Sequence, residues 1–400
     1  MESYPTNRQS ARSRRTRGLR NFIWILPVGL LAFVLFVLIR MATLDVLLDT
    51  VLTFEAPKPA ELSDLTAGSN FAVAVNGNAV ALNGSDVRST ASLAKMILAL
   101  AVMEKKPFDL GETGETIVIS QEMYDRYNWY SSNNGSTTGV KLGEEISEYD
   151  ALTSALLASS NNMADSLAIW AFGSLDDYRT YAQEMLGRIG AVNTTVGSDA
   201  SGFSESTTST ASDLALLGAK VLDNPVLAEI VGKTSAVVPV AGTIENTNKL
   251  LGELDIVGVK TGYNGLASGY CLVSGYRAGE SVVTLALLGA STREQSFNES
   301  KALIQELQTR LEPKEIVAKG AEVAHYDSWW AGRVPILTVE EKKDVVYEEL
   351  MSEIQISELN GKLLITSAHN EYEVLVKAQE FPLEPSLWQR FLRVFGWSAL

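Results

Sequence analysis

Alternating and helical spacings of apolar residues predict a mixed domain after residue 60. Apolar residues alternate on both sides of Asn76-Gly77, a turn pair that tolerates positive φ, and so predict a β-hairpin over residues 71–82. Helical spacing predicts helices at about 91–104, 148–158, 162–173, 176–189, 211–222 and 295–311. Apolar runs predict strands at about 255–262, 268–276 and 281–290. This order favours an α+β domain whose sheet is completed from both ends of the segment.

The pattern changes after Pro313, where short alternating runs predict a small all-β domain. These runs lie at 316–317, 334–339, 354–356, 362–366 and 372–376. Beyond Pro382 and Pro385, residues 387–395 place apolar side chains on one face of a helix flanked by arginines. This amphipathic helix either lies on a membrane surface or docks on its own domain.

Residues 22–39 contain no charged side chain, and a helix of these 18 residues approaches the thickness of a bilayer core. The first 20 residues carry six arginines and one glutamate, a net charge of +5, so the other 380 carry −20. We therefore expect an uncleaved membrane anchor with its N-terminus in the cytoplasm and the rest of the chain outside. The alternatives are a cleaved signal peptide, whose apolar core usually has ~7–15 residues, and a buried core helix.

These patterns divide the chain into six predicted segments: a basic cytoplasmic segment (1–20), a transmembrane helix (21–40), a linker (41–60), the mixed domain (61–311), the all-β domain (312–382) and the amphipathic helix (383–400). Hydrophobic residues at 46% and charged residues at 20% indicate a globular chain rather than a disordered one. The single cysteine, Cys271, excludes an intrachain disulfide, and the acidic body argues against nucleic acid as a partner. Both histidines, His325 and His369, follow the mixed domain, so we expect its chemistry to use neither imidazole nor a metal ion.

Ser92 and Lys95 form a Ser-x-x-Lys motif at the start of a predicted apolar helix. Positions i and i+3 share a helix face, so the amine can reach the serine oxygen. An amine that has lost its proton can act as the base for this hydroxyl. The alternative for Lys95 alone is a surface lysine whose apolar stem lies along the protein.

Two further polar motifs interrupt apolar sequence: residues 159–162 (Ser-Ser-Asn-Asn) separate two helical patterns, and residues 260–262 (Lys-Thr-Gly) close a strand. Small polar residues in apolar surroundings need hydrogen-bond partners, either at a corner between helices or in a site. An ammonium beside a hydroxyl and a glycine suits a carboxylate ligand. A strand end followed by a turn explains the same three residues without a ligand.

The three motifs occur in the order Ser-x-x-Lys, Ser-x-Asn and Lys-Thr-Gly, and with them the sequence resembles the serine penicillin-binding proteins and β-lactamases. It most closely resembles the D-alanyl-D-alanine carboxypeptidases, with supporting stretches at 139–144, 199–203, 209–217, 246–251 and 257–263. The resemblance covers residues 60–311. It implies a β-lactamase/transpeptidase-like domain, in which helices flank an antiparallel sheet and form a helical subdomain. The small all-β domain and an amphipathic tail are also features of this family.

The resemblance implies three catalytic residues, Ser92, Lys95 and Ser159, and five substrate-binding residues, Asn161, Lys260, Thr261, Gly262 and Tyr263. In this assignment Ser92 is the acylated nucleophile, Lys95 is its general base, and Ser159 passes a proton to the leaving D-alanine. Residues 160 and 162 also fit the Ser-x-Asn motif. The register that begins at 159 is preferred because the family sequence continues as Ala-Asp-x-Leu-Ala, which matches residues 164–168.

The implied binding roles concern the substrate's amide and carboxylate. Asn161 holds the peptide amide, while Lys260 and Thr261 receive the terminal carboxylate. The backbone N–H groups of Ser92 and Tyr263 form the oxyanion hole. Ala94 stands where the family often has threonine, and Asn162 replaces an aspartate common in one branch.

The expected function is that of a bacterial extracytoplasmic serine carboxypeptidase that trims the terminal D-alanine from peptidoglycan stem pentapeptides. The resemblance implies acylation by β-lactams and no cofactor; the expected partners are stem peptides, β-lactams and the cytoplasmic membrane. A DD-endopeptidase with the same motifs and a non-catalytic β-lactam sensor or wall-binding protein remain alternatives. A class A β-lactamase needs a glutamate after Ser-x-Asn to activate water, and only Glu184 and Glu205 occur between residues 160 and 210.

Overall fold

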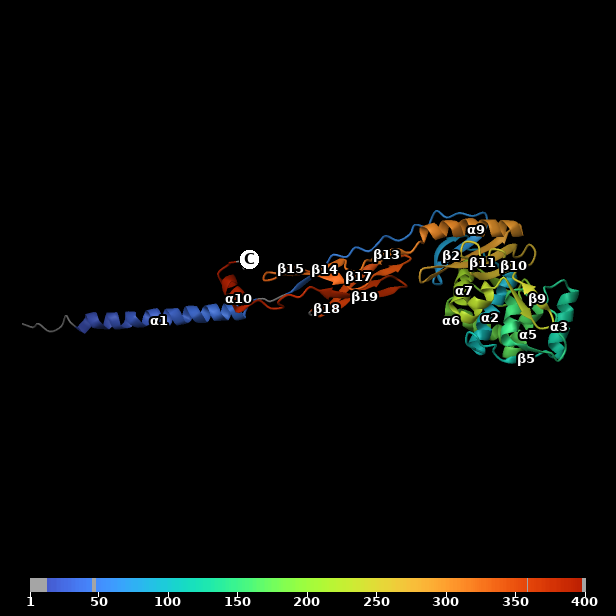
Figure 1. The fold of residues 1–400 in the computed structure, drawn as a ribbon, viewed down its shortest axis with the longest axis horizontal. Coiled ribbons are helices and arrows are strands. Elements are labelled where there is room, and N and C mark those ends of the chain that lie inside the picture. Colours follow the sequence, from blue (N-terminus) through green and yellow to red (C-terminus); the bar gives the residue numbers. More distant parts are fainter. Residues whose placement is uncertain (1–12, 45–47, 358, 398–400) are drawn as a thin grey trace, which may run out of the picture.

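The computed structural model describes residues 13–44, 48–357 and 359–397, with side chains from residue 26 onward. Figure 1 shows an elongated molecule with a mixed domain of helices and strands at one end and a sheet domain in the middle. Helix α1 (Ser13–Ala42) extends from the other end. The predicted basic segment 1–20 lies outside the described side chains. No helix within the described residues is both long enough and apolar enough to cross a lipid bilayer.

An antiparallel five-stranded sheet forms the centre of the mixed domain, with strand order β10-β11-β12-β2-β3. Its strands are β2 (Asn70–Val75), β3 (Asn78–Asn83), β10 (Gly258–Tyr263), β11 (Tyr270–Ala278) and β12 (Ser281–Ala290). The predicted hairpin is confirmed, because Val75 pairs with Asn78 and both turn residues between them have positive φ. Early and late strands meet where β12 pairs with β2, so both ends of the segment complete one sheet.

The six predicted helices of this domain are present as α2 (Ala94–Lys105), α4 (Glu148–Leu156), α5 (Asn161–Phe172), α6 (Leu175–Ile189), α7 (Ala211–Asp223) and α9 (Arg293–Arg310). Two further helices, α3 (Gln121–Ser132) and α8 (Pro225–Gly232), have no counterpart among the predictions. Helix α3 buries only Met123 and Tyr130 and therefore carries no apolar stripe. Helix α8 is one of the shortest helices, and the Asn224 side chain caps it by accepting from two backbone N–H groups.

Three short strand pairs complete the domain. They are β4 (Arg88–Ser89) with β7 (Thr208–Ser209), β5 (Thr116–Val118) with β6 (Glu145–Ser147), and β8 (Ser235–Val238) with β9 (Gly242–Glu245). Each strand has four residues or fewer. Such strands are too short to give a pattern of alternation that can be recognised in the sequence.

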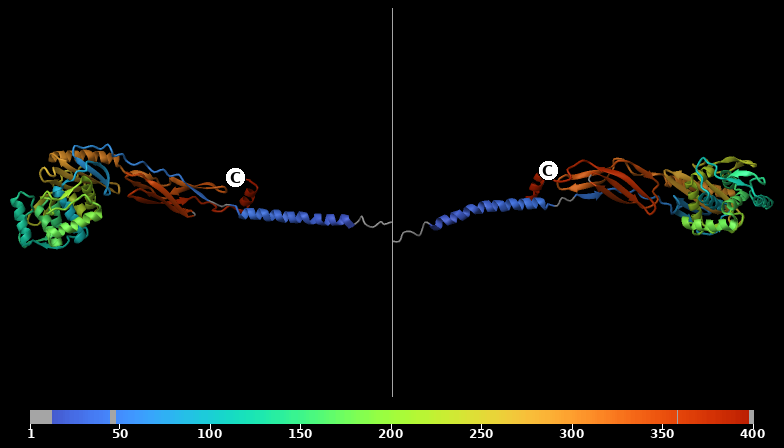
Figure 2. Two further views of the ribbon diagram at one scale, coloured as in Figure 1. Left: turned by 180° about the vertical axis from the view of Figure 1, so that it is seen from behind. Right: turned by 90° about the horizontal axis from the view of Figure 1, so that it is seen from below.

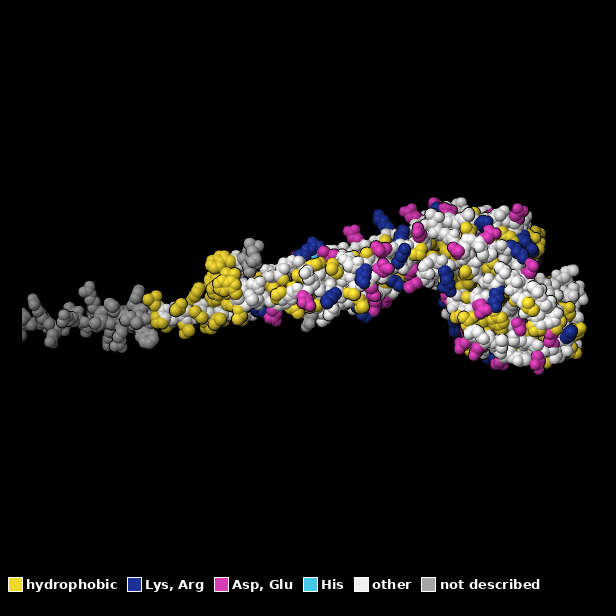
Figure 3. All heavy atoms as spheres, in the orientation of Figure 1, with side chains coloured by type: hydrophobic (Ala, Val, Ile, Leu, Met, Phe, Trp, Pro, Cys, Tyr) yellow, Lys and Arg dark blue, Asp and Glu magenta, His cyan; other side chains and the backbone are white. Residues whose placement is uncertain are grey.

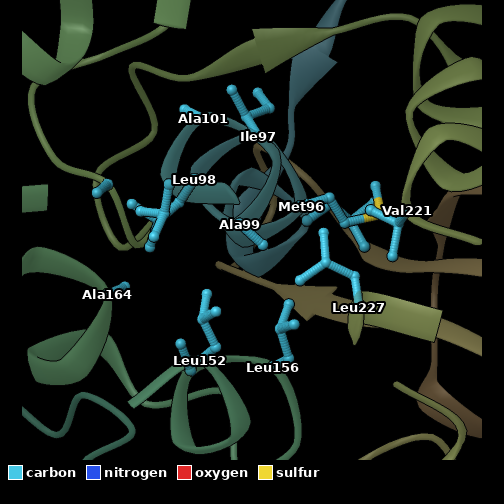
Figure 4. Packing of buried hydrophobic residues seen from close by; sticks show 14 of the residues in the cluster. Met96, Ile97, Leu98, Ala99, Ala101, Leu152, Leu156, Ala164, Val221 and Leu227 are labelled. Carbon is cyan, nitrogen blue, oxygen red and sulfur yellow. The ribbon is translucent and has the colours of Figure 1, made fainter. Parts of the chain in front are cut away.

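Helix α2 lies among other elements of the domain, which explains why it is apolar on several faces. Met96, Ile97 and Leu98 have no exposed surface and pack with residues of α4, α5, α7 and α8 (Figure 4). Full burial of one such side chain contributes ~1.5–3 kcal/mol to stability. This packing fixes the start of α2, where the Ser-x-x-Lys motif lies. Helix α9 belongs to a second cluster that includes Phe71 and Leu285 of the sheet.

A six-stranded sheet with the order β1-β14-β15-β19-β18-β17 forms the sheet domain. Its strands are β1 (Asp49–Leu52), β14 (Glu322–Ser328), β15 (Gly332–Thr338), β17 (Met351–Ser357), β18 (Asn360–Thr366) and β19 (Glu371–Ala378), and β13 (Lys314–Val317) pairs separately with β16 (Lys342–Asp344). Strand β1 differs from the prediction, which placed it in a linker at 41–60. Its four residues are all exposed, so they show no alternation, yet they pair with β14.

Helix α10 lies beside the C-terminal half of α1, at the end of the sheet domain that faces away from the mixed domain (Figures 1 and 2). Helix α10 (Leu387–Val394) confirms the predicted amphipathic helix, and the rings of Phe33 and Phe395 are 6.3 Å apart. The Gln389 side chain also donates to the Trp330 carbonyl of the sheet domain. Figure 3 shows hydrophobic side chains gathered over this end, whereas acidic and basic side chains are mixed over the sheet domain.

Candidate active site

Ser92 lies in a 3-10 turn, Ala91–Leu93, that leads directly into α2. The turn is tightly packed, since a Cβ atom on Gly202 would lie only 1.8 Å from the Ala91 carbonyl oxygen. Gly202 also has a φ of +70°, so this close approach requires glycine for two reasons. Lys95 follows one turn later, and its Nζ lies 2.9 Å from Ser92 Oγ. The predicted contact between the motif's serine and lysine is therefore present.

Lys95 is fully buried and has three oxygen atoms around its amine. Besides Ser92 Oγ, Nζ donates to Asn161 Oδ1 at 2.8 Å and to the Ser201 carbonyl at 2.7 Å. Burial lowers the pKa of Lys95 to about 7, against the opposing charges of Asp199 and Asp165. An amine with such a pKa is partly neutral at neutral pH and is suited to act as a general base. Its burial excludes the surface-lysine alternative.

The residues of the Ser-Ser-Asn-Asn motif divide between the site and a helix corner. Ser159 lines the cleft with a left-handed φ of 58°, and Asn161 contacts Lys95. Ser160 instead caps α5 by accepting from the Met163 N–H, and Asn162 accepts from the Thr138 N–H at 3.0 Å. The structure thus favours the register that begins at 159. A strained φ at a non-glycine residue is typical of functional sites.

Strand β10 brings the Lys-Thr-Gly motif to the Ser92 turn. A Cβ atom on Gly262 would lie 3.1 Å from the Thr90 carbonyl oxygen, so the two segments approach closely. Lys260 is buried, and its Nζ donates to the Thr261 carbonyl at 3.2 Å. Burial and the nearby Lys95 ammonium hold the pKa of Lys260 well below its usual range. Thr261 donates to Thr247 Oγ1 at 2.7 Å.

The motifs meet at a cleft of about 260 Å³. Its lining residues include Ser92, Ser159, Thr261, Gly262 and Tyr263 together with Asn134, Ser136, Thr247, Tyr270, Cys271, Arg293, Ser296 and Phe297. The other three predicted site residues are buried beside it and hydrogen-bonded into the same arrangement. Lys95 reaches Ser92, Asn161 reaches Lys95, and Lys260 reaches the backbone of Thr261. All eight predicted residues therefore come together.

Eight of the lining residues were not among the predicted site residues, and Thr247, Tyr270 and Arg293 are three of them. Tyr270 stacks on Tyr263 with ring centroids 4.2 Å apart. Arg293 begins α9 and is exposed, and its guanidinium forms no ion pair with any of the described residues. A guanidinium in a cleft can bind a carboxylate through two parallel hydrogen bonds. Thr247 lies in a stretch, residues 246–251, that supports the family resemblance. No local pattern identifies Tyr270 or Arg293, because the tertiary fold alone brings their elements to the motifs.

No three His, Cys, Asp or Glu side chains in the described part of the chain lie close enough together to hold a metal ion. The chemistry that the cleft offers is that of a serine hydroxyl, an amine of lowered pKa and hydrogen-bond donors for a carboxylate. This set suits acyl transfer from a peptide that carries a carboxylate. The serine attacks the peptide carbonyl, and the amine takes the proton of the serine hydroxyl.

Comparison with known proteins agrees with this chemistry. The model of the D-alanyl-D-alanine carboxypeptidase family, peptidase family S11, matches residues 54–292. The chain is 26% identical over 228 residues to the D-alanyl-D-alanine carboxypeptidase DacC of Escherichia coli (strain K12). It is 24% identical over 237 residues to DacF of Bacillus subtilis (strain 168). These matches cover 56% and 55% of this chain and 56% of each relative, so the chain spans about half the length of these curated relatives.

Two solved structures share the fold over most of the chain. Penicillin binding protein 5 from Haemophilus influenzae has a TM-score of 0.59 at 17% identity and covers 80% of this chain and 100% of its own. The D-alanyl-D-alanine carboxypeptidase DacD from Francisella tularensis has a TM-score of 0.57 at 18% identity and covers 82% and 96%. Both matches extend beyond residues 54–292. The expected mixture of helices and sheet is therefore confirmed at the level of fold.

Proposed function

Because the chain belongs to the D-alanyl-D-alanine carboxypeptidase family, we propose that it removes the terminal D-alanine of peptidoglycan stem pentapeptides through an acyl-enzyme on Ser92. The observation that carries this proposal is the position of the Lys95 amine, 2.9 Å from Ser92 Oγ and held by two further acceptors. A nucleophile in hydrogen-bond reach of an oriented base is the arrangement that acyl transfer needs.

Acylation begins when neutral Lys95 takes the proton of the Ser92 hydroxyl as Oγ attacks the carbonyl carbon of the scissile amide. The backbone N–H groups of Ser92 and Tyr263 donate hydrogen bonds to the resulting oxyanion. Ser159 passes the proton on to the amide nitrogen, the C–N bond breaks, and D-alanine leaves as an amine. A water molecule then attacks the ester, Lys95 takes its proton, and Ser92 regains its hydroxyl.

The terminal carboxylate of the stem peptide binds at the β10 side of the cleft. Thr261 offers a hydroxyl, and the buried Lys260 supplies positive potential when protonated. Arg293 on the same cleft adds a permanent charge and a planar pair of donors. β-Lactams carry a strained amide and a carboxylate in a similar relation, so we propose that they acylate Ser92 as well.

Two neighbouring activities differ in what they require. A class A β-lactamase needs a glutamate beside the acyl-enzyme, but Glu184 and Glu205 are both exposed and neither lines the cleft. An endopeptidase uses the same catalytic groups, and D-alanine release separates it from a carboxypeptidase. The stem pentapeptide is therefore the substrate that distinguishes them.

We also propose that a single N-terminal span holds the protein at the bacterial cytoplasmic membrane, with the N-terminus in the cytoplasm and the catalytic domain outside. The uncharged run at 22–39 and the preceding arginines support this topology. Sequencing the N-terminus of the mature, C-terminally tagged protein tests it. A mature chain that begins near residue 45 would contradict an uncleaved anchor.

The decisive experiment is labelling of the full chain in detergent with a fluorescent penicillin, in parallel with D-alanine release from a stem pentapeptide. Ser92→Ala should lose both signals, whereas the matched control Ser204→Ala, outside the cleft, should keep them. Labelling without D-alanine release would favour the endopeptidase or a sensor. A folded wild-type protein that takes no label would refute the proposed acyl-enzyme.

A further inference from the structure

A series of close polar contacts leads from Lys95 to a buried carboxylate that none of the three motifs contains. The Ser201 carbonyl accepts from Lys95, and the Ser201 hydroxyl lies 3.3 Å from the Tyr130 hydroxyl. Tyr130 in turn donates to Asp165 Oδ2 at 2.7 Å. Arg126 donates to the same carboxylate oxygen at 3.0 Å. Asp165 itself has no exposed surface.

Asp165 also holds the backbone that presents the Ser201 carbonyl. Its Oδ1 accepts from the Ala200 N–H at 3.0 Å. Asp199 accepts from the N–H of Ser201 at 2.9 Å and from its hydroxyl at 2.6 Å. Consecutive amides, those of Ala200 and Ser201, are thus fixed by two different carboxylates, which leaves the Ser201 carbonyl little freedom to turn away from Lys95.

The orientation of this carbonyl matters because a neutral amine has two N–H donors and one lone pair. If the two donors of Lys95 go to Asn161 Oδ1 and the Ser201 carbonyl, the lone pair is left for the Ser92 hydroxyl. Loss of either acceptor would let the amine rotate and turn its lone pair away from Ser92. The two acceptors therefore decide whether Lys95 is aimed at the nucleophile.

We propose that Asp165 is a positioning residue for the general base: it fixes the Ser201 carbonyl that aims Lys95, and its negative charge stabilises the ammonium formed when Lys95 takes the proton of Ser92. This inference rests on the proposed function of Ser92 and Lys95. Asp165 acts through Tyr130, Ala200 and Ser201 and does not line the cleft.

The charges around Lys95 determine the sign of the expected effect. Burial lowers the pKa of Lys95 to about 7, and Asp199 and Asp165 oppose this. Lys260 is a further buried cation beside the site, and the Lys95 ammonium lowers its pKa. Removing the charge of Asp165 leaves burial opposed by Asp199 alone. The pKa of Lys95 then falls further, and the base stays neutral to a lower pH.

Asp165 has neighbours of its own that bear on this argument. Burial and Asp199 raise its pKa to about 6, whereas the Tyr130 hydroxyl, Arg126 and the Ala200 N–H lower it. The Tyr178 phenol of α6 also interacts with this carboxylate. Asp165 is therefore mainly ionised at pH 7 and above, where Lys95 acts as a base. Loss of the Tyr130 hydroxyl would raise the pKa of Asp165 and so remove part of its charge near neutral pH.

The test is the pH dependence of the second-order rate constant for acylation of the full chain by a fluorescent penicillin, from pH 5 to 9. Asp165→Asn should lower the maximal rate about tenfold and move the midpoint of the acid limb down by about half a unit to one unit. Tyr130→Phe should shift it in the same direction by less. Asp213→Asn removes another buried carboxylate of this domain, one that does not act on the Lys95 pKa, and should leave the midpoint unchanged.

The outcomes separate this inference from the proposed function. A wild-type protein that takes no label at Ser92 would overturn both. A labelled wild type, with the wild-type midpoint and maximal rate in Asp165→Asn, would overturn the positioning role alone. If Asp165→Asn does not fold, Tyr130→Phe decides: an unchanged midpoint and rate in this variant would refute the role of the hydrogen bond from Tyr130 to Asp165.

Discussion

The cleft and the sheet domain differ in the kind of side chain that each one buries. Around the cleft, Lys95, Lys260 and Asp165 are each 1% exposed or less. In the sheet domain the buried face is mainly apolar, and β19 alternates strictly between exposed and buried residues. Burying a charge costs stability, whereas burying an apolar face supplies it. The comparison indicates that the cleft retains buried charged side chains that serve chemistry and lower stability. The sheet domain instead buries apolar side chains, which raise stability.

The largest expected effect tests the chemical side of this comparison. Lys95→Met should lower the acylation rate constant about 10³-fold, because general-base catalysis typically contributes ~10²–10⁴-fold. The melting temperature should change little, because the variant loses both the cost of burying the amine and the stabilisation that the hydrogen bonds of this amine supply. Fluorescent penicillin kinetics and thermal unfolding measure the two quantities. Lys105→Met, an exposed lysine on the same helix, is the control and should acylate normally.

The next effect follows from the pKa of Lys95, about 7. Below this pH the amine is protonated and cannot take the proton of Ser92, so acylation should slow about tenfold for each pH unit. Because half of the amine is already protonated at pH 7, the loss between pH 7 and pH 5 is about 50-fold. Stopped-flow labelling in buffers of constant ionic strength measures it. A rate that is flat across this range would show that Lys95 is not the titrating base.

A core substitution in the sheet domain should affect stability without affecting chemistry. Leu363 of β18 is fully buried, so Leu363→Ala should lower the free energy of unfolding by about 2–4 kcal/mol. The control is its neighbour Lys362, which pairs with Glu373 on the other face; Lys362→Ala should cost less than about 1 kcal/mol. Urea unfolding measures both variants. Acylation by Leu363→Ala below its unfolding transition should match the wild type, and a slower rate would mean that the two regions are coupled.

The smallest effect concerns a buried carboxyl group of the mixed domain. Glu148 is 1% exposed, burial raises its pKa to about 7, and one of its oxygens has no hydrogen-bond partner among the described residues. Its folded pKa exceeds the unfolded value of about 4.5, so this group makes the protein lose stability as pH rises from about 4.5 to 7. Glu148→Gln should therefore stabilise the protein by about 1–2 kcal/mol at pH 8 and much less at pH 4.5.

Urea unfolding at these two pH values measures the difference. Glu145→Gln, an exposed neighbour, should change stability by less than about 0.5 kcal/mol at either pH. Equal stabilisation by Glu148→Gln at both pH values would show that the carboxyl group is not titrating with the raised pKa.

Most of the mixed domain could be predicted because its local patterns are strong. The Asn76-Gly77 hairpin and the apolar helix after Ser92 both form as predicted. Elements without a local pattern were missed: α3 buries few residues, and β1 is a four-residue strand with every residue exposed. Strand β1 depends on its pairing with β14, which lies about 270 residues later in the chain.

The sequence alone determined the order of the three motifs and the amphipathic character of α10, because these depend on residue types at short spacings. The eight site residues followed from the resemblance that these motifs carry. Only the tertiary structure decided that Asn161 rather than Asn162 meets Lys95, that Arg293 lines the cleft, and that Asp165 lies within reach of the Ser201 loop. The contact between Lys95 and Ser201 joins residues 106 positions apart. Such contacts follow from how helices and sheet pack around a common core, and no spacing within the sequence encodes them.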